Sequence, residues 1–407
     1  MYNLTLFRFQ ALFRNFYLYM PVQTFFLLSH GIPLEAVVFS TTFYSLFAFL
    51  GEVPTGVFAD SYGQKISLIF GYTIEGLGLL LVFLFPSVMG LYAGASLQGF
   101  AGAFLSGSEE ALLYETVQAH KRTDYQKVYA QFLADGQASF MVATALAGVL
   151  YQTYGAASWS GLMLGTAIST LIAGVCALFL TDYKGDLPPD LADTGSKALE
   201  TVREGFKLIL KNDTIFTLTL VTLLTVAGEY FLLGVYQPHF EAHNVSAFWI
   251  GAVLSLGAFL NIVATRNIHR LENRFRLPTL LLFLNGILGL LYLGLAFFTF
   301  PVVLILLYVA MNGLFNLQTP IVSDYINTRT SSRVRATVLS GISFVRRFFQ
   351  IGFTWVLGSI VGIWGIGTGL ATQGVYLLIG AALSYYLLVR CGCAHKVFET
   401  SMEPIEI

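Results

Sequence analysis

The segment from Glu52 to Lys65 reads EVPTGVFADSYGQK and decides how the rest of the chain folds. It places two acids, a lysine, a proline and two glycines between two long apolar runs. Glycine and proline at this density predict a tight turn. Charged side chains are costly inside a bilayer, so the segment is expected to include the point where two apolar helices meet water.

The composition predicts that these helices belong to a membrane protein. Of 407 residues, 56% are hydrophobic and 11% are charged, whereas a soluble domain carries about 25% charged residues. A helix needs about 20 apolar residues to cross the hydrocarbon core. The alternating pattern of an outer-membrane barrel is missing, so we expect an all-α polytopic protein. We predict 12 transmembrane helices, near 10–29, 34–58, 66–86, 88–118, 128–150, 158–180, 214–238, 247–264, 278–298, 301–323, 336–360 and 367–389.

The positions of Lys and Arg favour the same count. If both termini are cytoplasmic, the basic residues fall in the predicted cytoplasmic loops, as the positive-inside rule requires. The opposite loops contain neither Lys nor Arg. We assign Arg8 and Arg14 to the cytoplasmic amino end, which leaves Arg346 and Arg347 as the arginines inside a predicted span.

A long polar stretch divides the predicted spans into six and six. Its Asp-Leu-Pro-Pro sequence ends the sixth helix, and basic and apolar residues then alternate at helical spacing. That helix would either lie on the membrane face or be a solvated linker. We expect an amino-terminal bundle over 1–181, a cytoplasmic linker over 182–212, a carboxy-terminal bundle over 213–390 and a cytoplasmic tail over 391–407.

The turn quoted above carries a family resemblance. Gly56, Asp60, Gly63 and Lys65 resemble the G-x-x-x-D-x-x-G-R-K signature of the major facilitator superfamily, with Gln64 where arginine is usual. The resemblance implies two pseudo-symmetric six-helix bundles that rock about a central substrate site.

The resemblance also implies a role for this turn. In the superfamily the turn latches against the eleventh helix and stabilises the outward-facing state. Arg333 and Arg335 directly precede that helix here, so we expect them to be the partners of Asp60 in a conformational gate.

Three further phrases resemble the mostly prokaryotic members related to drug:proton antiporters. They are SGSEEALLYETV at 106–117, YQPHFEAHNVSAFWIG at 236–251 and SDYINTRTSSRVRATVLS at 323–340. Ala95 stands where many proton-coupled members have arginine. The small residues of the fifth span replace the glycine-proline pair usual in antiporters.

Ionisable residues inside the bilayer are expensive and are therefore functional candidates. At a rise of about 1.5 Å per residue, several lie at a similar depth, roughly 15 Å from the cytoplasmic helix ends. Glu75, on a supporting helix, is expected to act indirectly. The candidates for a proton or charge relay are Glu109, Asp135, Glu229, Glu52, Arg346 and Arg347.

The relay has two open interpretations. A pair between Glu52 and Arg346 or Arg347 would bridge the two halves and act as a switch, or the charges would form a static buried network. Neighbouring residues point about 100° apart on a helix, which favours Glu109 over Glu110 for the cavity. Glu229 is the second choice for a proton site.

Substrate contacts are expected from aromatic and amide side chains on the helices that line such a cavity. The candidates are Tyr17, Gln23, Tyr114, Tyr236, Asn312 and Phe315. They would suit an amphipathic organic solute, although most aromatic residues of a membrane protein face lipid or pack between helices.

These observations predict a secondary active transporter, more in the direction of efflux than uptake, in the inner membrane of a prokaryotic cell. The expected partners are a small-molecule substrate and the lipid bilayer, with no nucleic acid, and the protein would be a monomer. We expect no enzyme activity, no metal and no cofactor, with the proton gradient as energy source. The alternatives are uptake by symport or uniport of a nutrient or metal chelate, and lipid flipping.

Overall fold

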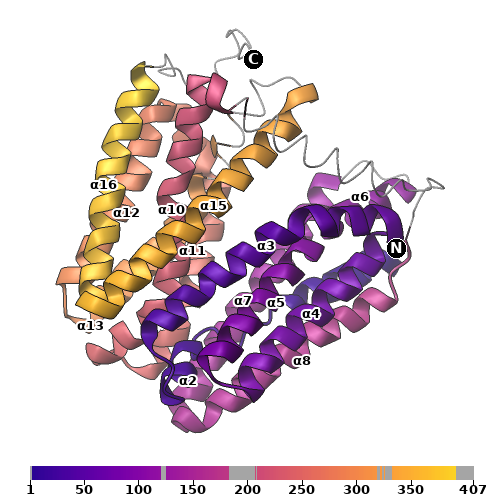
Figure 1. The fold of residues 1–407 in the computed structure, drawn as a ribbon, viewed down its shortest axis with the longest axis horizontal. Coiled ribbons are helices and arrows are strands. Elements are labelled where there is room, and N and C mark those ends of the chain that lie inside the picture. Colours follow the sequence, from indigo (N-terminus) through magenta and orange to yellow (C-terminus); the bar gives the residue numbers. More distant parts are fainter. Residues whose placement is uncertain are drawn as a thin grey trace. The chain divides into compact units, whose positions relative to one another are not determined.

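The structure is a computed structural model (Figure 1) that describes residues 2–120, 125–182, 207, 209–318, 321–322, 325 and 332–390. Within these ranges the regular elements are all helices. Nine stretches of them are long and apolar enough to cross a membrane, and two of these, Val88–Ala119 and Lys127–Leu178, each cover more than one helix. The prediction of an all-α, multi-pass membrane protein is confirmed.

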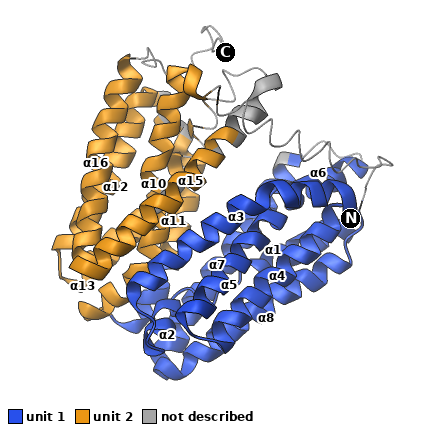
Figure 2. Ribbon diagram, viewed as in Figure 1, with its two compact units in different colours: residues 1–198, 246–255 blue, residues 199–245, 256–407 orange. Residues whose placement is uncertain are grey.

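The chain forms two compact units, which Figure 2 shows in different colours. Unit 1 comprises residues 1–198 and 246–255, and unit 2 comprises residues 199–245 and 256–407. The predicted linker helix falls almost entirely outside the described residues, and so does the predicted tail.

Unit 1 is built mainly from helices of the amino-terminal half. In this unit α3 packs on α5, α4 lies against both α5 and α8, and α1 contacts α7 and α8. The helices are α1 Tyr2–Arg14, α2 Gln23–Ser29, α3 Leu34–Tyr62, α4 Gln64–Leu84, α5 Val88–Leu105, α6 Ser108–Ala119, α7 Tyr125–Tyr154, the short 3₁₀ helix η1 Gly155–Ser158, and α8 Trp159–Leu178.

The prediction of one continuous helix over 10–29 is wrong. Helix α1 ends at Arg14. Between this end and the start of α2 at Gln23, short turns provide hydrogen bonds for some of the backbone N–H groups. Asn15 stops α1, because its amide nitrogen donates to the Ala11 carbonyl at 2.9 Å. Pro21 has no backbone N–H to continue a helical hydrogen-bond pattern.

The predicted span over 88–118 is also interrupted. Helix α5 ends at Leu105, Ser106 is extended, and Gly107 has φ +82° before α6 begins. Glycine adopts this left-handed conformation without a steric penalty, so the sequence places the break here.

Unit 2 contains the remaining helices. Helix α10 packs against α15 and α16, and α12 contacts α13 and α16. The Asn212 side chain accepts a hydrogen bond from the Ile215 backbone at 3.0 Å and so caps the start of α10. The elements are α10 Asp213–Ala242, α11 Ala247–Arg274, α12 Leu277–Phe297, α13 Pro301–Leu314, η2 Phe315–Leu317, α15 Ser332–Trp364 and α16 Ile366–Arg390, of which the first residues of α11 group with unit 1.

Candidate functional site

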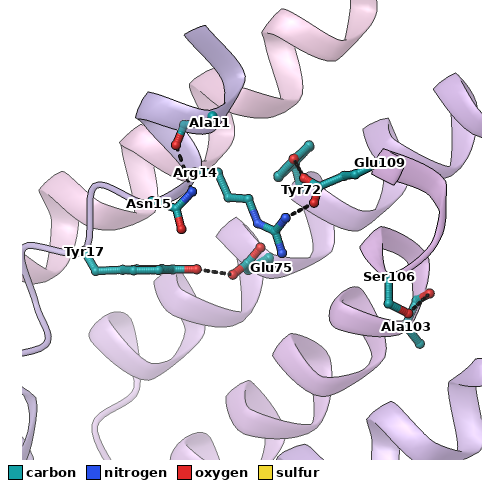
Figure 3. A network of polar contacts seen from close by, with 9 residues as sticks. All are labelled: Ala11, Arg14, Asn15, Tyr17, Tyr72, Glu75, Ala103, Ser106 and Glu109. Atoms are coloured by element: carbon teal, nitrogen blue, oxygen red, sulfur yellow. Dashed lines mark hydrogen bonds and ion pairs between the residues drawn. The ribbon is translucent and has the colours of Figure 1, made fainter. Parts of the chain in front are cut away.

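The interruptions of the two predicted spans in unit 1 bring opposite charges together. Arg14, the last residue of α1, forms an ion pair with Glu109, the second residue of α6, and Figure 3 shows the pair. The Tyr72 hydroxyl on α4 also donates to the Glu109 carboxylate. The Arg14 and Glu109 side chains are 27% and 13% exposed, so the pair is largely withdrawn from solvent.

Helix dipoles favour this arrangement. A helix carries partial positive charge at its amino end and partial negative charge at its carboxyl end. Arg14 lies at the carboxyl end of α1, and Glu109 lies in the first turn of α6. Each charge therefore interacts favourably with its own helix as well as with its partner.

A second carboxylate faces the same arginine. Tyr17, in the segment between α1 and α2, donates to Glu75 Oε1 at 3.4 Å (Figure 3). Glu75 Oε2 is buried and makes no hydrogen bond to the described residues. Arg14 interacts electrostatically with both Glu75 and Glu109. One partly buried arginine is thus shared by two carboxyl groups.

A cavity of about 300 Å³ adjoins this cluster inside unit 1. It lies between the end of α1, the α5–α6 interruption and α7, and its lining mixes charged, amide and aromatic side chains. The polar lining includes Arg14, Asn15, Glu109, Glu110, Tyr129 and Gln137.

A second ion pair joins α1 to α7. Arg8 Nε lies 2.6 Å from Asp135 Oδ2, and Arg8 is 54% exposed. Asp135 is one of the predicted relay residues. Its ion-pair partner, Arg8, belongs to the same unit.

The two amino-terminal arginines were missed as site residues. The sequence predicts them at the cytoplasmic end and leaves Arg346 and Arg347 as the arginines within the spans. The structure instead places Arg14 in a buried cluster, because α1 ends there and turns its last side chain toward α4 and α6. Asn15, a polar residue within an apolar segment, was the available signal for this helix end.

The predicted gate lies at the α3–α4 turn. Asp60 is exposed on the last turns of α3, and Gly63 joins the two helices with φ +99°. The Lys65 backbone N–H, in the first turn of α4, donates to Asp182 Oδ2 at 3.4 Å. Asp182 was not among the predicted residues, and it supplies negative charge at the start of α4.

The remaining residues of the predicted gate are Gly56, Arg333 and Arg335. Gly56 lies within α3, where an added Cβ would meet no atom within 4 Å in the described structure. Arg333 and Arg335 lie in the first turn of α15, in unit 2, and their side chains fall outside the described set. Their pairing with Asp60 stays a prediction.

Unit 2 holds its own buried charges. Arg346 on α15 interacts electrostatically with Glu229 on α10, and the neighbouring Arg347 adds a like charge. Arg346 Nε is buried and finds no hydrogen-bond acceptor in the described structure. Glu52 is half-buried on α3 of unit 1, so its bridge to either arginine stays a prediction.

The predicted substrate residues of unit 2 lie among packed side chains. Tyr236 is 1% exposed and its ring centroid lies 4.8 Å from that of Tyr308. Phe315 is buried and meets the edge of Tyr292. Asn312 donates to the Tyr308 carbonyl at 3.1 Å.

In unit 1 the predicted substrate residues are more accessible. Gln23 is half-buried at the start of α2, and Tyr114 on α6 is 46% exposed. Tyr17 lies closest to the charged cluster, through its hydrogen bond to Glu75.

Comparison with known sequences gives two matches. The model of the family described as Major Facilitator Superfamily matches residues 9–354. An uncharacterized transporter from Buchnera aphidicola subsp. Schizaphis graminum is 30% identical over 104 residues. That match covers 26% of this chain and 25% of the relative, so it spans only a quarter of the relative's length.

Several solved transporters share the fold. The nucleoside transporter NupG superposes with a TM-score of 0.71 at 15% identity, covering 98% of this chain and 99% of that one. A POT family transporter in complex with 5-aminolevulinic acid gives 0.72 at 12% identity, covering 97% and 96%. A D-xylose-proton symporter gives 0.70 at 12% identity, covering 97% and 98%. At these identities the likeness concerns the fold alone.

Proposed function

Since the chain belongs to the major facilitator superfamily and is a multi-pass membrane transporter, we propose that it is a secondary active transporter coupled to protons. It moves a small amphipathic organic solute across the cytoplasmic membrane, in the direction of efflux, as in the drug:proton antiporter branch. Alternating access comes from two bundles, 1–181 and 213–390, joined by the linker 182–212.

The observation that carries this proposal is the sharing of Arg14 by Glu75 and Glu109. An ionised carboxylate without a counter-charge is costly in a dry site. One arginine neutralises one carboxylate, so the second acid is stable there when it holds a proton. The cluster therefore has a place for one transported proton, which Glu75 carries while Arg14 is paired with Glu109.

The remaining charged residues fit supporting roles in this proposal. Asp60 with Arg333 and Arg335 closes the cytoplasmic gate, and Glu229 with Arg346 forms the corresponding charge pair of unit 2. The protein works as a monomer in the inner membrane of a prokaryotic cell, with the proton gradient as its energy source and no cofactor.

Uptake is a second candidate, and one observation favours it. Ala95 stands in place of the arginine that many proton-coupled members of the superfamily carry, and Ala143, Ala147 and Gly148 replace the glycine-proline pair of antiporters. The solute would then be a nutrient or metal chelate that enters by symport or uniport.

Reconstituted vesicles separate these functions. Cells lacking or overproducing the protein are first screened for drug susceptibility and nutrient growth, which identifies a solute. The solute is then added to proteoliposomes that contain the trapped pH dye pyranine. Proton movement opposite to the solute supports efflux by antiport, and movement in the same direction supports symport. Solute movement without any proton movement overturns the coupling.

A further inference from the structure

The cavity beside the charged cluster carries an acid that the Arg14 pair does not neutralise. Three charged residues line it, namely Arg14, Glu109 and Glu110. Arg14 is paired with Glu109. Glu110 is exposed and, among the residues that the structure describes, forms no ion pair and accepts one hydrogen bond, from the Tyr125 hydroxyl at 3.4 Å. The lining therefore has a formal charge of −1.

A group of tyrosine side chains lies on one side of this acid. The rings of Tyr125 and Tyr129 stack with centroids 5.8 Å apart, and Tyr114 meets Tyr125 edge-on at 5.0 Å. Tyr129 also lines the cavity. Three tyrosines from α6 and α7 thus lie next to one carboxylate.

Tyr125 does not add negative charge to this group. Burial and the neighbouring Glu110 carboxylate raise the pKa of Tyr125 to about 12, so the phenol stays protonated near neutral pH. Its hydroxyl acts as a hydrogen-bond donor to Glu110, and its ring face keeps the negative quadrupole that attracts cations.

A carboxylate beside several tyrosine rings is suited to an organic cation. Ring faces attract ammonium groups that are poorly hydrated, and the carboxylate supplies the opposite full charge. An anion would meet an acid that has no ion-pair partner within the described residues, and a neutral solute would gain nothing from its charge. We propose that Glu110, Tyr125 and Tyr129 form a binding site for an alkylated or quaternary ammonium group.

This inference rests on the proposed function, because it names the substrate class of the proposed transporter. The site lies at the end of unit 1 that the predicted topology makes cytoplasmic. A cation bound there lies beside the Arg14–Glu109 pair, which lines the same cavity.

The test is direct binding to the full-length protein in detergent, without any gradient, measured by ligand-observed NMR. The probes are choline, which is permanently cationic, and 3,3-dimethylbutan-1-ol, its neutral carbon isostere. We expect choline to bind more tightly than the alcohol by about tenfold or more. Equal affinity for the two probes, or no binding of choline, overturns the site.

Variants locate the binding. Glu110→Gln and Tyr129→Leu are each expected to weaken choline binding about tenfold. Tyr125→Phe, which keeps the ring, is expected to retain most of it. Glu241→Gln changes an exposed glutamate on α10 and is the matched control, with no expected effect. Unchanged binding in Glu110→Gln overturns the assignment.

The outcome is separable from that of the proposed function. Proton-coupled solute movement in vesicles together with absent choline binding would contradict the cation site and leave the transporter proposal intact. Choline binding that depends on Glu110, without proton-coupled movement of any solute, would support the site and contradict the coupling.

Discussion

Arg14 and Glu109 are 95 positions apart in the sequence, and their ion pair connects the end of α1 to the start of α6. Both helices stop or begin at interruptions of a predicted membrane span. The pair therefore joins two breaks in the helical framework, at the point where a charge is least expensive for each helix.

Replacing Arg14 tests how far this pair stabilises unit 1. Arg14→Gln leaves Glu109 largely buried without its counter-charge, and we expect the free energy of unfolding to fall by up to about 3 kcal/mol. Arg14→Gln combined with Glu109→Gln should recover most of that loss. Thermal unfolding in detergent measures both.

The Arg8–Asp135 pair provides the control for this prediction. Arg8 is more exposed than Arg14, so Arg8→Gln is expected to change the melting temperature little. A loss in Arg8→Gln as large as that in Arg14→Gln would contradict the special role of the buried pair.

The Tyr72 hydroxyl can be removed without loss of the ring. Tyr72 is fully buried and donates to Glu109, so Tyr72→Phe leaves that carboxylate with one donor fewer. We expect a loss of about 1–2 kcal/mol in the free energy of unfolding. Equal stability of wild type and variant in chemical denaturation would show that the hydrogen bond contributes nothing.

Two glycines of the family signature should respond in opposite ways to alanine. At Gly63, with φ +99°, an added Cβ would clash with Asp182 Oδ2, so Gly63→Ala is expected to cost about 2 kcal/mol or more. Gly56 lies within α3 with open space beside it, so Gly56→Ala is expected to stabilise the protein by up to about 1 kcal/mol. Comparable melting temperatures for the two variants would refute this.

Glu75→Gln separates coupling from folding. Glutamine has a similar shape and carries no exchangeable acid proton, so the variant should fold with near wild-type stability. It should still exchange labelled solute at equilibrium across vesicles, while losing accumulation driven by a pH gradient. Accumulation equal to that of the wild type would exclude Glu75 as a proton carrier.

Much of the fold could be predicted because the bilayer imposes simple rules on the sequence. Apolar length, the placement of Lys and Arg, and the turn from Glu52 to Lys65 indicated a helical, multi-pass protein of this superfamily. The predicted boundaries of α4, from 66 to 86, lie within two residues of the observed helix, Gln64–Leu84.

The charged cluster was harder to predict, because it depends on where helices stop. Hydropathy averages over about 19 residues, so Asn15 and Gly107 disappeared inside longer apolar segments. Arg14 was assigned to the cytoplasmic end although the predicted span over 10–29 ran past it, and the break before α6 that brings Glu109 to this arginine was not predicted. The sequence contains both helix-ending signals. The ion pair that they allow forms only when the fold brings the end of α1 to the start of α6.

The interruption at Gly107 has a mechanical consequence. Since Gly107 separates α6 from α5, α6 is a short rod whose position is set by its own contacts, such as the hydrogen bond from Ser108 Oγ to Ser67 Oγ at 2.9 Å. Glu109 and Glu110 lie next to each other in the first turn of that rod, so a small rotation that withdraws one from Arg14 redirects the other. Any change that turns this helical segment would therefore move both acids together.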